Sequence, residues 1–117
     1  MRILIAIVLS TFFFIHLEKP GSPTIAKLDI QATSLKVKWT APIDDGGSPI
    51  TAHRVVIRNS STEIKNENST DLLITSLSVG GLERNTTYTV KVFARNAVFE
   101  GHAAEKKVRT KYEGSKL

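Results

Sequence analysis

The 117-residue sequence contains no cysteine and only three histidines, so several kinds of chemistry are excluded at once. Without thiols there is no disulfide, no thiolate metal site and no cysteine nucleophile. The histidines, His16, His53 and His102, are scattered, and none is paired at the spacing of metal ligands. No serine-nucleophile elbow, paired-carboxylate motif or phosphate-binding loop is present either. We therefore expect a protein that uses no cofactor and is not an enzyme.

Acidic residues are the minority among the charged ones. The chain has 16 lysines and arginines against 11 aspartates and glutamates, which gives a formal net charge of +5. This excess of positive charge favours acidic partners. The adjacent Asp44 and Asp45 have no third acidic ligand near them in sequence, so we expect them to form a turn and not a cation site.

The longest stretch without charge is ILIAIVLSTFFFI, residues 3–15, which follows Arg2. A helix over this run would span about 20 Å, short of the hydrocarbon core of a bilayer, which is about 30 Å thick. One positive charge before a short apolar run is typical of a secretory signal peptide, which we predict over residues 1–19. Small residues are missing at the usual cleavage positions near His16. Two alternatives are an uncleaved amino-terminal anchor and a buried strand or helix of the domain.

The carboxyl end carries a competing targeting signal. Ser115-Lys116-Leu117 is the tripeptide that the peroxisomal import receptor reads. A signal at the amino terminus acts earlier, during synthesis. We therefore predict secretion, or anchoring at the cell surface, over peroxisomal import.

Between these ends, apolar residues recur with the period of two that is typical of β-strands. In LKVKWT, residues 35–40, every second residue is apolar, and the only tryptophan ends the row. Other β-rich runs cover residues 24–30, 53–58, 73–79, 88–95 and 103–110. Residues 60–71 are polar and favour a loop or a weak edge strand. Short strands separated by turns at this interval predict an antiparallel sandwich or barrel.

The stretch WTAPIDDGGSPI, residues 39–50, has the composition of a loop. Gly46 and Gly47 permit φ above zero, while Pro42 and Pro49 stiffen the two ends. We expect this loop to carry the chain from one sheet to the other, beside a tryptophan that fills the space between them.

Several features follow one another in a specific order: Pro20-x-x-Pro23, Trp39-x-x-Pro42, DGGSPI at residues 45–50, Leu82 and then Tyr88-x-Val90-x-Val92-x-Ala94-x-Asn96, Gly101 and Thr110. Together they resemble a fibronectin type III domain. The resemblance implies an all-β, seven-stranded antiparallel immunoglobulin-like sandwich over residues 20–110, followed by a tail at residues 111–117. It also implies a core around Trp39, Leu82 and Tyr88. His53 departs from the family, which usually has Tyr at this position.

The alternation also predicts a surface. If the valines and isoleucine of residues 55, 57, 90 and 92 face the core, the residues between them face outward. These are Arg54, Val56, Arg58, Lys91, Phe93 and Arg95, and Lys107 and Arg109 extend the set. The resemblance places the two strands next to each other. The result is a basic face with two exposed apolar groups, Val56 and Phe93.

We expect this face to bind a protein partner, with an acidic protein or a sulfated glycan as the chemistry that fits. The alternative is an ordinary solvated sheet face. Secretion disfavours nucleic acid as a binding partner, although the positive charge alone would allow weak, salt-sensitive binding to it. Membrane contact is expected only if the amino-terminal segment stays uncleaved, and we expect a monomer.

Three sequons for N-glycosylation occur: Asn59-Ser60-Ser61, Asn68-Ser69-Thr70 and Asn85-Thr86-Thr87. In a secreted protein these asparagines are glycan acceptors. Asn68 lies in the most polar stretch and is the best candidate, whereas Asn85 lies at a corner where the family often has a tight turn.

Proteins with similar domains include adhesion molecules, receptors and matrix proteins, so the resemblance implies adhesion, or matrix or receptor binding. This is an argument by association, because one fold hosts many functions. The second hypothesis is a structural spacer from a larger tandem receptor or scaffold. The predicted signal peptide and the short tail favour the first.

Overall fold

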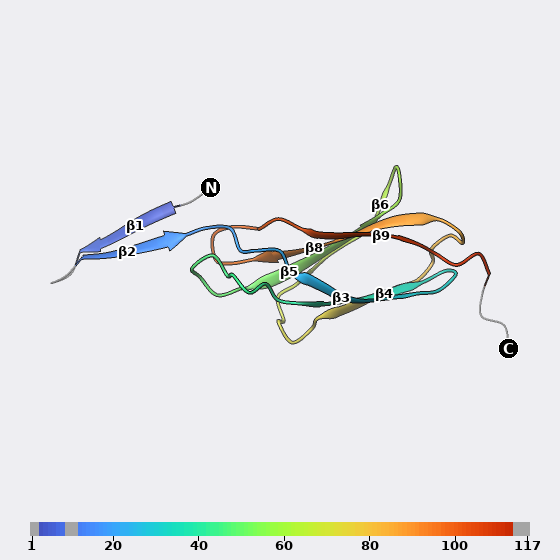
Figure 1. Ribbon diagram of the computed structural model, residues 1–117, viewed down its shortest axis with the longest axis horizontal. Coiled ribbons are helices and arrows are strands. Elements are labelled where there is room, and N and C mark those ends of the chain that lie inside the picture. The colour runs from blue at the N-terminus through green and yellow to red at the C-terminus, as the bar shows by residue number, and fades with distance from the viewer. Residues whose placement is uncertain (1–2, 9–11, 114–117) are drawn as a thin grey trace.

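The computed structural model describes residues 3–8 and 12–113, and every regular element within them is a β-strand (Figure 1). Seven strands form the sandwich: β3 (Thr24–Ile30), β4 (Leu35–Thr40), β5 (Ala52–Arg58), β6 (Glu63–Ser69), β7 (Ser76–Val79), β8 (Thr87–Arg95) and β9 (Ala104–Arg109). A three-stranded sheet has the order β3-β4-β7, and a four-stranded sheet has the order β6-β5-β8-β9. All pairings are antiparallel, which confirms the predicted architecture.

Two further strands, β1 (Ile3–Val8) and β2 (Phe12–Leu17), pair only with each other, as an antiparallel hairpin. In Figure 1 this hairpin projects from one end of the sandwich. Most of the apolar run assigned to a signal peptide is therefore extended here, while residues 9–11 and the Ser115-Lys116-Leu117 tripeptide lie outside the described residues. The signal peptide concerns the chain before processing, and it stays a prediction. Over residues 3–8 and 12–113, no helix is long and apolar enough to span a bilayer.

The core lies between the two sheets and follows the alternation of the strands. In β4 the buried residues Leu35, Val37 and Trp39 alternate with exposed neighbours. In β8 the buried row begins at Tyr88. The corner residue Leu82 is buried against the same cluster. These rows meet because the period-two side chains of each strand present one face to the opposite sheet.

The polar residues 63–69 form a strand, β6, which pairs along β5 at the edge of its sheet, and this confirms the edge-strand alternative for the polar stretch. One boundary differs from the prediction. The predicted strand over residues 73–79 is wrong at its start, because β7 begins at Ser76 and Leu73 is 91% exposed. A turn at Asp71 takes up these residues: its carboxylate accepts a hydrogen bond from the Leu73 amide at 3.0 Å, and its carbonyl accepts one from the Ile74 amide. Local turn chemistry thus overrides the alternation.

The loop over residues 39–50 is built by its aspartates and glycines. The carboxylates of Asp44 and Asp45 accept hydrogen bonds from the amides of Gly46 and Gly47, each at 2.9 Å. The φ angles of the two glycines are 76° and 89°, in the left-handed region that side chains disfavour. The predicted turn role of both pairs is confirmed.

Candidate interaction surface

Strand register places the whole predicted set on the outer face of the four-stranded sheet. Arg54 lies opposite Phe93, Val56 opposite Lys91, and Arg58 opposite Thr89. Arg95 continues the outward row of β8 at its end. On the next strand, Lys107 lies opposite Thr89 and Arg109 opposite Thr87, so β9 extends the face as expected.

Arg54 and Phe93 form the centre of one half of this face. The guanidinium carbon of Arg54 lies 4.2 Å from the centroid of the Phe93 ring, a cation–π contact. Arg54 Nε donates a hydrogen bond to Glu100 Oε1 at 2.9 Å, and Nη1 donates to Asn66 Oδ1 at 3.3 Å. The side chains of Arg54 and Glu100 are 27% and 31% exposed, so the ion pair is only partly screened by water. Arg54 is therefore held by the fold and is not a free cation.

Two expectations for this face are wrong. Val56 is only 5% exposed, because it lies in an inner strand, with Asn66 and Lys91 opposite it on the two adjacent strands. Arg54 and Arg58 flank it on the same face of β5. Phe93 is half-buried under Arg54. Neither residue offers a freely exposed apolar surface.

The face is also less basic than the alternation indicated. Glu100 pairs with Arg54, Glu105 lies opposite Lys91, and Glu63 lies opposite Arg58. None of these acids stood out in the sequence, because Glu100 and Glu105 are distant in the chain from the cations opposite them and Glu63 lies in a weakly patterned strand. The exposed cations that remain on this face are Arg58, Arg95, Lys107 and Arg109.

The sequons fall in different environments. Asn59 is half-buried in the turn after β5, and its Oδ1 accepts hydrogen bonds from the amides of Ser61 at 2.9 Å and Thr62 at 2.7 Å. Asn85 has a φ of 49° and accepts a hydrogen bond from Arg109 Nε at 2.8 Å. Asn68 is exposed on β6.

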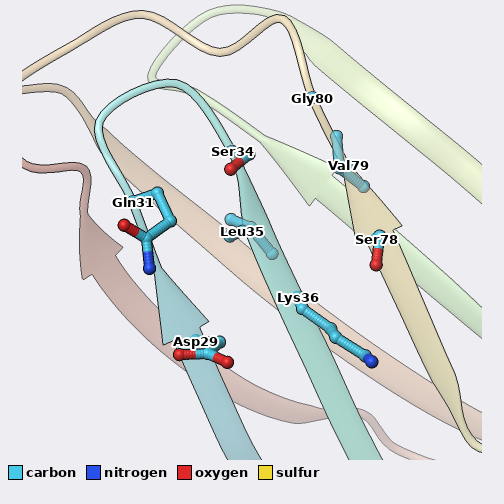
Figure 2. Close-up of a pocket in the computed structure, with 8 residues that line it drawn as sticks. All are labelled: Asp29, Gln31, Ser34, Leu35, Lys36, Ser78, Val79 and Gly80. Carbon is cyan, nitrogen blue, oxygen red and sulfur yellow. The ribbon is translucent and has the colours of Figure 1, made fainter. Parts of the chain in front are cut away.

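The opposite sheet carries a shallow hollow of about 350 Å³ that no sequence pattern indicated (Figure 2). Its lining residues are Asp29, Gln31, Ser34, Leu35, Lys36, Ser78, Val79 and Gly80. Asp29, Lys36 and Ser78 form one row across β3, β4 and β7. The hollow holds one acidic and one basic side chain, Asp29 and Lys36, and none of the predicted binding residues lies in it.

A family model for the fibronectin type III domain matches residues 18–111. The chain belongs to the fibronectin type III domain family. The predicted resemblance is thereby confirmed, and its boundaries nearly coincide with the sandwich described above.

Relatives of this fibronectin type III domain occur in much longer proteins. The titin homolog of Caenorhabditis elegans is 36% identical over 94 residues, which cover 78% of this chain and, after rounding, 0% of that protein. The cell adhesion molecule DSCAM of Gallus gallus is 24% identical over 90 residues, 74% of this chain and 4% of that protein. The chain thus spans 4% or less of these curated relatives. Among solved structures, domains d3-d4 of the rat CD45 extracellular region share the fold, with a TM-score of 0.73 and 16% identity over 94% of this chain and 64% of that chain.

At one end of the fibronectin type III sandwich, the chain that precedes β3 is fastened to two loops. The buried Asn96 donates its amide to the carbonyl oxygens of Glu18 at 2.8 Å and Asp45 at 2.9 Å. The backbone amide of Glu18 donates to the Gly46 carbonyl at 2.9 Å. A Cβ added at Gly46 would lie 2.3 Å from the Glu18 carbonyl oxygen, and one at Gly47 equally close to that of His16. We call this set of contacts the amino-terminal clamp.

Proposed function

We propose that this fibronectin type III domain is a secreted or cell-surface interaction module, and that it contacts an acidic partner through the outer face of the four-stranded sheet. The observation that carries the proposal is the set of exposed cations, Arg58, Arg95, Lys107 and Arg109, which share one face with the Arg54–Phe93 contact. The similarity to a cell adhesion molecule supports a role in adhesion or receptor binding.

The spacing of these cations suits an extended array of anions. Arg58 and Lys107 lie on β5 and β9, on either side of Thr89 in β8. Since neighbouring strands are about 4.8 Å apart, the backbones of these two residues are about 10 Å apart. Thr89 between them is short and leaves the space open. Both acidic proteins and sulfated glycans present anions repeatedly on this length scale, and contacts between such exposed charges weaken as salt is added.

Heparin is a suitable probe, because it presents sulfates in such an array. We expect the full chain to be retained on heparin and released by salt, and the triple change of Arg58, Lys107 and Arg109 to Ser to lower the salt needed for elution. The matched control changes Lys27, Lys36 and Lys38 to Ser, which removes the same charge from the opposite sheet. Equal losses in both variants would show a response to net charge alone and would contradict the proposal.

The amino-terminal clamp favours a second candidate, a spacer whose preceding segment is held in a fixed direction. The clamp ties residues 16–20 to the loops after β4 and β8 by hydrogen bonds and close backbone approaches. If this function holds, backbone amides of residues 16–19 should be as rigid as those of β8 in nuclear magnetic resonance relaxation, and Asn96→Ala should loosen them. Nanosecond mobility of this segment in the unaltered chain would exclude the spacer role.

A further inference from the structure

We propose that Asn68 carries an N-linked glycan and that the first sugar of the glycan lies in the hollow beside it. This inference rests on the proposed secretion of the domain, because the glycan is added in the secretory pathway. It also bears on the outer face, since the glycan would lie at one end of that face.

The position of Asn68 meets the demands of a modified side chain. It lies near the end of β6, at the free edge of the four-stranded sheet, and is exposed. Its side-chain amide has no hydrogen-bond partner among the described residues. A large substituent on this nitrogen therefore breaks no hydrogen bond, and no hydrogen bond fixes the orientation of the amide that carries it.

The other two sequons are more constrained. At Asn59 the side-chain oxygen is fixed by two backbone amides, and at Asn85 it is fixed by Arg109. In both, the plane of the amide is set by the fold, so the direction of an attached sugar would be set as well. Asn68 alone among the three combines exposure with a side chain that the described residues leave untied.

The hollow next to Asn68 has room for one sugar ring. It has a volume of about 350 Å³ and is lined by Thr51, Ala52, Asn68, Thr70 and Arg95. Thr70, the hydroxyl residue of the sequon, therefore shares the hollow with the acceptor. The Thr51 hydroxyl donates to the Arg95 carbonyl at 3.2 Å and can still accept from a sugar hydroxyl, while the Thr70 hydroxyl and the Arg95 guanidinium can donate to an acetamido carbonyl. The hollow is open to solvent, as a site for the first sugar of a chain must be.

The modification is a single substitution at carbon. Asn68 Nδ2 attacks C1 of the first N-acetylglucosamine of a lipid-linked oligosaccharide pyrophosphate, the co-reactant of this step. The new bond is Nδ2–C1, and the bond broken is that between C1 and the pyrophosphate oxygen. The pyrophosphate leaves with the electron pair, and Nδ2 loses one proton. No oxidant or reductant is required.

A glycan at this place would divide the outer face. It would cover Arg95 and the free edge of β6, whereas Arg58 and Lys107 lie toward the other end of the sheet. An exposed strand edge is a template for pairing with other chains, and a bulky sugar blocks such pairing. The same modification would thus protect the edge and direct the acidic partner to the Arg58–Lys107 half.

The test is secretion of the full chain from animal cells, followed by peptide mass spectrometry before and after enzymatic removal of N-glycans. We expect the Asn68 peptide to be glycosylated and the signal to be lost in Asn68→Gln and Thr70→Ala. Asn66→Gln is the matched control, since Asn66 lies on the same strand and is not part of a sequon. To test the hollow, Arg95→Ala should speed endoglycosidase trimming of the folded protein several-fold, whereas Arg58→Ala should not.

A parallel expression of the same full chain behind a heterologous secretory leader separates the two proposals. Secreted protein with unmodified Asn68 from this source overturns the glycan site. Modified Asn68 from this source, with the unaided chain retained in the cytosol, overturns the proposed secretion and leaves the site standing. A glycan on Asn68 that is trimmed at the same rate in Arg95→Ala overturns its placement in the hollow.

Discussion

The rings of Trp39 and His53 pack edge to face in the core, with centroids 6.0 Å apart and planes inclined at 64°. The two residues are 3% and 2% exposed. Within the described part of the chain, neither imidazole nitrogen nor the indole nitrogen has a hydrogen-bond partner. Burial without a partner disfavours the charged imidazolium, and desolvation therefore lowers the pKa of His53 below 6.5. A neutral histidine fills the position where the family usually has tyrosine.

This packing predicts a loss of stability in mild acid. Below pH 6.5 the unfolded chain takes up a proton at His53 that the folded domain does not. The free energy of unfolding should therefore fall as the pH decreases from 6.5 toward the lowered folded pKa, by up to about 1.4 kcal/mol per pH unit, and this contribution should be absent above pH 6.5. Urea unfolding at a series of pH values measures it.

The control for this prediction is His53→Phe, which keeps an aromatic ring in the core and removes the titration. His16 and His102 remain in both proteins, so their contributions cancel in the difference. If both proteins lose the same stability between pH 6.5 and pH 5, His53 is not the cause.

The hydroxyl of Tyr88 should contribute a measurable hydrogen bond. It accepts a hydrogen bond from the backbone amide of Glu83 at 2.9 Å, and this bond holds the corner before β8 against the core. Tyr88→Phe should lower the free energy of unfolding by about 1 kcal/mol, because the ring packing is kept and one partly buried bond is lost. Chemical denaturation provides the measurement. Tyr112→Phe is the control, since Tyr112 is 73% exposed, and a comparable loss there would argue against the assignment.

Trp39 is expected to be the largest single contributor to the core. Trp39→Ala removes a buried ring from between the sheets and should cost about 3–5 kcal/mol of folding stability. Typical domains have only about 5–15 kcal/mol in total, so the melting temperature followed by circular dichroism should fall by roughly 12–40 °C. Leu73→Ala serves as the reference, because this exposed side chain should leave the melting temperature nearly unchanged. A folded Trp39→Ala variant with an unaltered melting curve would contradict the sandwich core.

Three glycine substitutions, of which only Gly46→Ala lies in the amino-terminal clamp, separate the cost of backbone strain from the cost of close packing. Gly80→Ala meets open space at an ordinary φ and should change stability by less than about 0.5 kcal/mol. Gly81→Ala also meets open space but at a φ of 70°, which should cost about 1–2 kcal/mol. Gly46→Ala adds a clash with the Glu18 carbonyl to a φ of 76°, so it should cost more than Gly81→Ala. Equal losses at Gly46 and Gly81, measured by thermal unfolding, would mean that the clamp is loose in solution.

Much of the sandwich followed from patterns that are local in the chain. Side-chain alternation in residues 35–40 and 88–95 identified the two rows that hold Trp39 and Tyr88, because a strand with one buried face must alternate. The loop around Gly46 was identified by its turn-forming residues, because only a few residue types suit its φ angles. The order of these signals identified the family.

The alternation failed at two places, at Val56 because of neighbouring strands and at Leu73 because of a local turn. Val56 alternates as an outward residue and does lie on the outward face, but Asn66 and Lys91 on the adjacent strands leave it covered. Leu73 matched the parity of β7, but the turn at Asp71 released it to solvent. Alternation reports which side of a strand a residue occupies, and not what the next strand places over it.

The sequence by itself determined most strands of the sandwich and the tryptophan and tyrosine of its core, because each depends on residues that are close together in the chain. The order of these local signals along the chain identified the family. Only the tertiary structure decided the electrostatics and the contacts of the site. Arg54 meets Glu100 across 46 positions, and Asn96 meets Glu18 across 78. Such pairs are created by strand order and register, which bring distant segments within a few ångströms, and no periodicity in the sequence encodes them.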